Sequence, residues 1–277
     1  MELNLNQNQI VILIIIGVAL FFMILGVPVL LGSLNYLGFI DVPFLPSANS
    51  STKVLFIGEP SLGEKVALDN LSSTITYSVR SVDTFSISPE EELYQYDIII
   101  FDQASGGIDK SISVTLGDAI QKYVNKGGNL IIVMNSGIYQ SSGLNGYTAA
   151  DVIGWKATFG KIIPVDCIAN KDGVPSCKEG MEESVIGRVW KQDYDHPIME
   201  GIEVAPPQGE APRSMKVLSV QADEGAKTIA YIKSDATPQT YPAILEKKHL
   251  PTGTVIYFNY DPGMTPGIFK NTLYYLK

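Results

Sequence analysis

The sequence predicts an α/β domain, a three-layer sandwich with a mostly parallel sheet and a β-rich C-terminal half, on one N-terminal transmembrane helix. Three observations lead to this prediction. Residues 10–31 form an uninterrupted apolar run. Between residues 53 and 135, short apolar runs alternate with helix-like segments, which is typical of βαβ units and parallel sheets. From residue 161 onward, strand-like runs follow one another with little helix between them.

The apolar run at residues 10–31 contains no charged side chain. At a rise of about 1.5 Å per residue it covers the roughly 30 Å hydrocarbon core of a bilayer. A cleaved signal peptide is the alternative, but such peptides carry a basic n-region and only about 7–15 apolar residues. Here no Lys or Arg precedes the run. We therefore expect a short tail at residues 1–9, a retained anchor at 10–31 and a Ser-, Asn- and Pro-containing linker at 32–52.

The side of the membrane on which the domain lies is indicated by cysteines and sequons. The first basic residue is Lys53, so charges next to the helix give no orientation. Cys167 and Cys177 have a spacing suited to a local disulfide, with two free thiols as the alternative. N-x-S sequons begin at Asn49 and Asn70 and are candidate glycosylation sites. These features predict a single-pass cell-membrane protein with an extracellular C-terminal domain.

The domain expected at residues 53–277 begins with alternating elements. Strands are predicted at residues 53–58, 74–79, 96–102 and 129–135, and helices over 61–71 and 113–125. In the second half we expect strands at 161–166, 215–220, 228–233, 243–247 and 254–259, and a final helix over 266–276.

Composition excludes several classes of function. The formal net charge is −9 and no basic run occurs, which argues against a nucleic-acid partner. No CxxC pair or cluster of histidines indicates a metal site. The glycines after the first strand fit neither G-x-G-x-x-G nor a P-loop, so no cofactor is expected.

Three segments together carry a family resemblance. The first is YDIIIFDQ followed by AIQKYVNKGGNLIIVMN, the second is DHPIMEG at residues 195–201, and the third is GTVIYFNYDPG at residues 253–263. In this order they resemble the class I glutamine-amidotransferase-like superfamily. The resemblance is to its non-amidotransferase branches, namely ThuA-like proteins and the related domains of gliding-motility and intraflagellar-transport proteins. It implies a flavodoxin-like fold over most of residues 53–277.

The resemblance also implies which residues an active amidotransferase would need. These are a Cys nucleophile on a tight strand-to-helix turn and a His base close to it. The strand at residues 130–134 is followed by Asn135 and Ser136, and no cysteine stands there. Ser136 is a candidate nucleophile, and an ordinary loop serine is the alternative. His196 is the candidate base, with Asp195 and Glu200 beside it in the sequence; its alternative role is to orient a turn.

Polar residues after the strands are candidate ligand contacts. Open α/β sheets bind ligands outside the carboxyl ends of their strands, and ordinary polar loops are the alternative. The candidates are Glu59, Asp102, Gln103, Asn135, Ser136, Asp195 and His196.

These observations predict a membrane-anchored, exported and non-catalytic domain. We expect it to bind a protein partner or a glycan as a subunit of a membrane or cell-surface complex, because the nucleophile is missing and fold alone implies no reaction. One alternative is a ThuA-like carbohydrate-processing enzyme that uses His196. A second alternative is a self-assembling structural subunit of an envelope assembly, that is, a homo-oligomer.

Overall fold

The fold is that of a computed structural model of the 277-residue chain. It describes residues 51–85, 87–104, 109–141, 153–169, 173–250 and 253–277. Thr52–Lys277 forms one compact unit. The predicted tail at 1–9, the anchor at 10–31, nearly all of the linker and the sequon at Asn49 lie outside the described residues. Within the described ranges, no helix is both long enough and apolar enough to cross a membrane.

One half of the main sheet is parallel. Its strands lie in the order β2 (Ile75–Arg80), β1 (Thr52–Gly58), β3 (Ile98–Asp102), β5 (Asn129–Val133) and β14 (Thr254–Phe258). The residues of β3 are all buried, as are those of β14, because helices cover both faces of this half. The apolar runs of the sequence therefore correspond to the centre of the sheet.

The other half is antiparallel and continues from β14. Its order is β14, β13 (Thr240–Lys248), β12 (Lys227–Ser234), β8 (Glu183–Lys191) and β10 (Arg213–Val217), with the short β9 (Val204–Ala205) also paired to β8. This half is the β-rich C-terminal part that the sequence predicts. The α/β class is thereby confirmed, with the parallel strands in one half of a mixed sheet.

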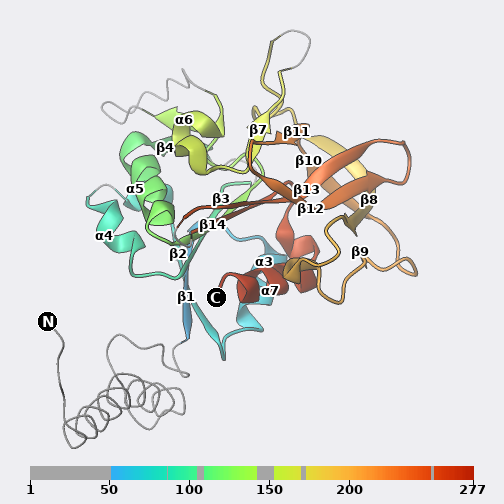
Figure 1. The fold of residues 1–277 in the computed structure, drawn as a ribbon, viewed down its shortest axis with the longest axis horizontal. Coiled ribbons are helices and arrows are strands. Elements are labelled where there is room, and N and C mark those ends of the chain that lie inside the picture. Colours follow the sequence, from blue (N-terminus) through green and yellow to red (C-terminus); the bar gives the residue numbers. More distant parts are fainter. Residues whose placement is uncertain (1–50, 86, 105–108, 142–152, 170–172, 251–252) are drawn as a thin grey trace, which may run out of the picture. The chain divides into compact units, whose positions relative to one another are not determined.

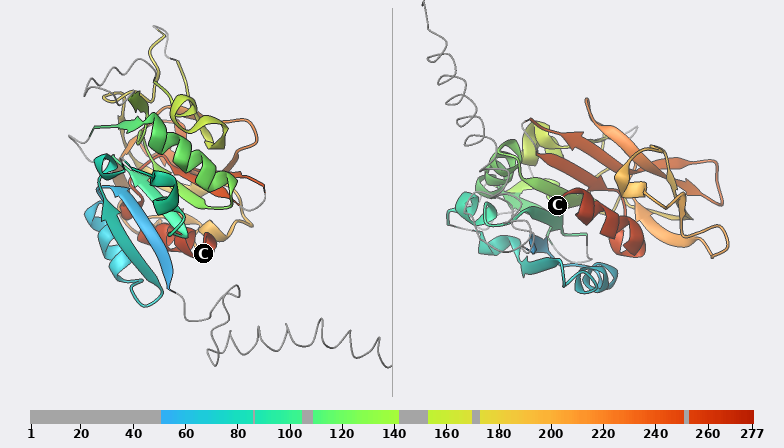
Figure 2. Two further views of the ribbon diagram at one scale, coloured as in Figure 1. Left: turned by 90° about the vertical axis from the view of Figure 1, so that its left-hand side faces the viewer. Right: turned by 60° about the horizontal axis from the view of Figure 1, so that its bottom comes forward.

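Helices lie on both sides of the sheet (Figures 1 and 2). On one side α5 (Val114–Asn125) packs against α4 (Pro89–Leu93) and α6 (Trp155–Phe159). On the other side α3 (Leu62–Asp69) packs against α7 (Pro266–Tyr275). The unit thus has three layers, with the apolar core on either face of the parallel strands. Small elements complete it: η2 (Val82–Thr84), β4 (Ser111–Ser113), β6 (Tyr139–Ser141), η3 (Gly160–Ile162), β7 (Val165–Cys167), η4 (Pro197–Met199), β11 (Val220–Ala222) and η5 (Pro262–Met264).

Two predicted strands are wrong. The run at residues 161–166 forms η3 and only then β7, because Pro164 has no N–H and separates the two. The run at 215–220 belongs to two sheets, since β10 pairs with β8 whereas β11 pairs with β7. The nine-residue strand β8 was not predicted at all. The linker boundary also shifts, because Thr52 already pairs with Ile75 in the sheet.

The predicted disulfide is present and joins Cys167 to Cys177, whose Cα atoms are 5.4 Å apart. It closes the loop that leaves β7, and Cys177 is fully buried. The sequon residue Asn70 is exposed at the C-terminal cap of α3. A glycan on Asn70 would therefore project into solvent.

Candidate functional site

The carboxyl ends of the parallel strands bring together residues that are far apart in the sequence. Gly58 at the end of β1 pairs with Asp102 at the end of β3. A Cβ atom on Gly58 would lie 1.7 Å from the Asp102 carbonyl oxygen, so only glycine permits this approach. The loop after β14 brings Asp261 to the same edge, where Asp261 Oδ1 accepts a hydrogen bond from Ser61 Oγ at 2.9 Å.

Helix α3 places a buried glutamate beside Asp102. Ser61 caps the helix, and its backbone N–H donates to Glu64 Oε2 at 2.8 Å while Ser61 Oγ accepts from the Glu64 N–H. This is a capping box, and it fixes the direction of the Glu64 side chain. Glu64 is fully buried, and its Oε1 atom receives no hydrogen bond from the described residues.

The environment of Glu64 and Asp102 favours the protonated form of both carboxyl groups. Burial and the nearby Asp102 carboxylate raise the pKa of Glu64 well above its usual value. Burial likewise raises the pKa of Asp102 to about 7, and the charge of Asp261 adds to the shift, whereas the Ala104 N–H opposes it by donating to Asp102 Oδ1 at 2.6 Å. Glu64 Oε1 has no donor among the described residues, and a proton on the Glu64 carboxyl group removes the cost of burying a charge there. Both carboxyl groups therefore keep a proton to a higher pH than isolated carboxyl groups do.

A pocket of about 250 Å³ opens onto Asp102 and Asp261. We call it the acidic pocket. Lys216 enters it from β10, so it holds one cation beside two carboxyl groups. Its lining residues are Ser61, Asp102, Ala104, Met134, Ser214, Lys216, Asp261 and Met264.

A second pocket of about 370 Å³ lies at the ends of β1 and β3 and takes in the predicted contacts Glu59 and Gln103. Asp83 and Asp109 also line it, and its character is polar. Asp102 thus faces one pocket and its neighbour Gln103 lines the other. The ends of the parallel strands do carry concave sites.

The turn after β5 holds a methionine in a strained conformation. Met134 has φ of +48°, in the left-handed region that residues other than glycine seldom adopt. Its N–H donates to the Phe258 carbonyl at 2.7 Å, which holds the turn in place. The side chain lines the acidic pocket. A sharp turn at the end of a strand is the position where hydrolases of the α/β class hold a nucleophile, and here it holds a thioether.

The candidate nucleophile Ser136 is fully buried and engaged in the fold. Its Oγ donates to the Val133 carbonyl at 2.6 Å and accepts from the Gln103 N–H at 2.7 Å. The Gln103 side chain accepts from the Gly137 N–H at 2.9 Å and donates to the Asp109 carbonyl at 2.6 Å. These contacts tie β3 to the turn after β5, so Ser136 matches the loop-serine interpretation.

Asn135 is also buried, and its Nδ2 donates to Glu182 Oε1 at 2.7 Å. Its side chain reaches toward the segment before β8 and is not among the residues that line either pocket. Of the predicted ligand contacts, Glu59, Asp102 and Gln103 line pockets, whereas Asn135 and Ser136 form internal hydrogen bonds.

His196 lies in a different part of the fold. Its Nδ1 accepts from the Ile198 N–H at 3.3 Å, so Nε2 carries the ring proton and lies 3.4 Å from Glu246 Oε2 on β13. Tyr275 of α7 donates to Glu246 Oε1 at 2.5 Å, and its ring centroid is 4.8 Å from that of His196. This buried group shares no residue with the acidic pocket.

The sequence pairing of His196 with Asp195 or Glu200 is wrong, because both acids are exposed and the partner is Glu246. Burial would raise the pKa of Glu246, but contacts from His196 and Tyr275 outweigh it and hold that pKa below its usual value. His196 thus fits the interpretation of a residue that orients a turn. Among the residues that the structure describes, no group of three or more His, Cys, Asp or Glu side chains is arranged to hold a metal ion.

Sequence reasoning missed Glu64, Asp261 and Glu246. Ser61 and Glu64 have the S-x-x-E spacing of a capping box, and this signal was available in the sequence. Asp261 has no comparable signal, because it reaches Ser61 only through the fold. The contact between Gly63 and the backbone of Gly263 brings these two loops together.

No protein-family model matches the chain, and no curated protein matches it. Among solved structures, the chain is similar to a beta-galactosidase from a Rahnella species, with 12% identity and a TM-score of 0.47 over 82% of this chain and 31% of that chain. It is also similar to a GMP synthase component from Thermoplasma acidophilum, with 11% identity, a TM-score of 0.45 and coverage of 82% and 94%. A third is the glutaminase domain of Trypanosoma brucei CTP synthase, with 10% identity, a TM-score of 0.43 and coverage of 82% and 93%. The chain spans less than a third of the galactosidase and nearly all of the two amidotransferase chains.

Proposed function

We propose that this chain is a membrane-anchored, exported domain of the amidotransferase-like, flavodoxin-like type that binds a protein partner or a glycan without catalysing a reaction. The observation that carries the proposal is Met134. This residue occupies the strained turn after β5 and lines the acidic pocket. A thioether is a poor nucleophile and a weak hydrogen-bond acceptor, and it suits a surface that contacts a ligand.

The uncharged apolar run at residues 10–31 and the disulfide support the proposed location. Disulfides persist in oxidising compartments, and Cys167 is bonded to Cys177. A tethered domain meets other membrane components at a raised local concentration, which suits a binding subunit.

The enzyme alternative would use His196. Its ring is only 6% exposed, and its two nitrogens face Ile198 and Glu246. A general base must reach the proton it removes within hydrogen-bond distance or through one water. The acidic pocket is lined by other residues, and this observation favours binding over His196 chemistry.

The test is purification of the full chain from its own cells in a gentle detergent, followed by mass spectrometry of everything that co-elutes. Ser214→Trp would fill the acidic pocket from an exposed position on β10. Val114→Trp, on the opposite helical layer, is the matched control because Val114 is also exposed. A stoichiometric partner or glycan should be retained by the wild type and by the control and lost from Ser214→Trp.

A lone monomer that carries no ligand would contradict the binding role. The enzyme alternative would then be tested with His196→Ala against a panel of glycans. A defined homo-oligomer that Ser214→Trp leaves intact would instead favour the self-assembling subunit.

A further inference from the structure

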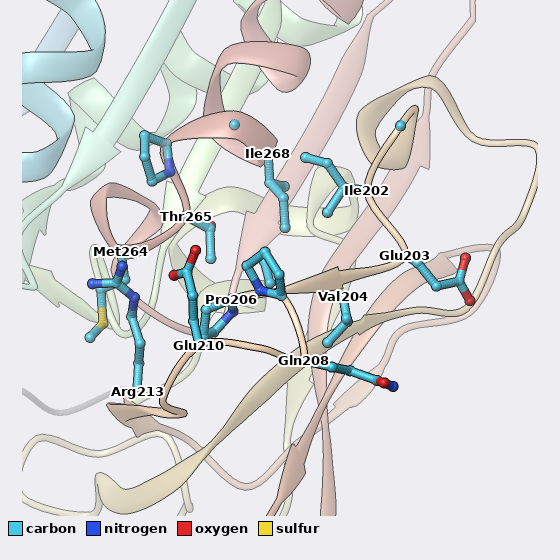
Figure 3. A pocket seen from close by; sticks show the side chains of 15 residues that line it. Ile202, Glu203, Val204, Pro206, Gln208, Glu210, Arg213, Met264, Thr265 and Ile268 are labelled. Atoms are coloured by element: carbon cyan, nitrogen blue, oxygen red, sulfur yellow. The ribbon is translucent and has the colours of Figure 1, made fainter.

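An apolar groove of about 430 Å³ lies between the start of α7 and the segment that contains β9 (Figure 3). Ile268 and Thr265 contribute from α7 and its cap, and Ile202 and Val204 from the segment opposite. Four charged or amide side chains stand among the lining residues: Glu203, Gln208, Glu210 and Arg213. Concave sites with an aliphatic lining and few polar groups are typical places for a ligand.

The groove and the acidic pocket adjoin at one residue. Met264 lines both. Strand β10 also borders both, with Arg213 in the groove and Ser214 and Lys216 in the pocket. This strand is the last one in the main sheet on that side. An extended chain that passes Met264 would therefore meet the aliphatic lining of the groove on one side of this residue and the carboxyl groups of the pocket on the other.

The charges along this path favour a cation. The groove and the pocket together present Glu203, Glu210, Asp102 and Asp261, against the two cations Arg213 and Lys216. Behind the pocket, Glu64 is fully buried and its Oε1 has no donor among the described residues. The carboxyl groups that line the pocket itself, Asp102 and Asp261, would gain from a cationic partner.

We propose that the groove and the acidic pocket form one docking site for an extended protein segment in which a lysine or arginine follows aliphatic or proline residues. The cationic side chain would enter between Asp102 and Asp261, and the aliphatic residues would lie on Ile202, Val204 and Ile268. This inference rests on the proposed binding function and names its partner class.

The lining favours a polypeptide over a glycan. Among the described residues, neither the groove nor the acidic pocket is lined by an aromatic side chain. Aromatic rings combine an apolar face with a polar edge, and flat ligands stack on such faces. Branched aliphatic side chains and prolines in a groove fit the side chains of a peptide better.

The site should respond to pH in a defined direction. Asp102 faces Glu64 from α3, Asp261 from the loop after β14, Lys110 from the segment before β4 and Lys216 from β10 across the pocket. A cation binds the ionised form of Asp102, whose pKa of about 7 leaves it mainly protonated at pH 6. Affinity should therefore rise by about tenfold from pH 6 to pH 8.

The experiment is selection of phage-displayed random peptides on the immobilised full chain in detergent at pH 8. The selected peptides should be enriched in a lysine or arginine next to aliphatic or proline residues. Synthetic copies should bind the Val114→Trp control as they bind the wild type. Binding should weaken at least about tenfold on Val204→Trp, which blocks the groove, and on Asp261→Asn, which removes a charge and keeps the oxygen that accepts from Gly263.

Glu210→Lys gives a second variant at an exposed position, and its folding should be unaffected. Glu210→Lys should also weaken the binding of the cationic peptides. Asp102→Asn should remove the pH dependence of peptide binding. Selection of acidic or random sequences, or equal binding to all variants, would overturn the inference. A glycan that binds the wild type but not Val204→Trp would overturn the peptide proposal and leave the binding function intact.

Discussion

At the scale of single residues, partners decide what a polar side chain does. Ser136 and His196 have side chains that can catalyse reactions, and in this fold both are buried and hydrogen-bonded to the chain itself. Glu64 caps its own helix and also meets Asp102. The type of a residue and its spacing in the sequence therefore predict its role less well than its contacts in the fold do.

We expect Ser136→Ala to destabilise the fold by about 1–3 kcal/mol, because the buried Gln103 N–H loses its acceptor. Chemical denaturation of the purified full chain measures this. Ser78→Ala on β2 is the control, since Ser78 is exposed and its loss should change the free energy of unfolding by less than about 0.5 kcal/mol. Equal effects of the two substitutions would contradict the structural role of Ser136.

Gly58→Ala should be far more costly than Gly225→Ala. Both glycines have positive φ, at +118° and +77°, and both substitutions carry a backbone cost of about 1–2 kcal/mol. Only at Gly58 does the new methyl group meet Asp102, whereas nothing lies within 4 Å at Gly225. We expect a difference of at least about 2 kcal/mol in the free energy of unfolding. A similar cost at both positions would show that β1 and β3 do not approach as described.

At the scale of elements, the apolar runs predicted the parallel strands and the capped helices, but not the antiparallel half. The strands β3 and β14 read as buried segments because all of their residues are apolar or enclosed. Strand β8 was not predicted because only alternate residues such as Val185 and Val189 are buried, while neighbours such as Ser184 and Ile186 are exposed. Alternation of this kind is a weak signal in a single sequence.

Only the part of the candidate site that follows a buried parallel strand was predicted from the sequence. Asp102 and Gln103 follow a clear strand, so their position at the sheet edge was foreseeable. Asp261 and Met264 belong to the loop after β14. The sequence predicted a turn there, but it did not predict which residues the turn contacts. These contacts depend on long-range packing, such as that of Gly63 against Gly263, and such packing produces no local pattern in the sequence.

The disulfide element gives a third prediction. Replacing both Cys167 and Cys177 by alanine should lower the free energy of unfolding by about 2–3 kcal/mol, because the closed loop no longer restricts the unfolded chain. Denaturation with and without a reducing agent measures it. The reductant should lower the midpoint of the wild type and leave the double variant unchanged. If the wild type is insensitive to complete reduction, the bond contributes nothing to stability.

At the scale of the whole molecule, the carboxyl pair links stability to pH. The folded-state pKa of Asp102 is about 7, above its unfolded value, so the folded protein holds a proton that the unfolded chain releases between about pH 4 and 7. Its contribution is fully present below pH 4 and is lost as the pH rises through 7. The contribution of Glu90 to stability depends on pH in the opposite direction, because Lys122 and Lys126 lower its pKa to about 2. This contribution is present near neutral pH and is lost as the pH falls toward 2.

We therefore expect the wild type to lose about 3 kcal/mol of stability from this group between pH 4.5 and pH 8. Urea midpoints at several pH values measure the slope. Asp102→Asn stays neutral and keeps an oxygen for the Ala104 N–H, so its profile should be flatter over this range. Asp83→Asn, at an exposed position, should keep the wild-type slope. Parallel profiles for all three proteins would contradict a raised pKa of Asp102.

The order of strands also has a consequence for synthesis on the ribosome. Strand β5 is finished at Val133, yet its second neighbour β14 begins only at Thr254. Until that segment has emerged, β3 covers one side of β5 and the other side is an open, apolar edge that can recruit another chain. The parallel half cannot close before β14 has been translated. A factor that shields nascent chains would act during this interval, and chains truncated before residue 254 should aggregate rather than fold in part.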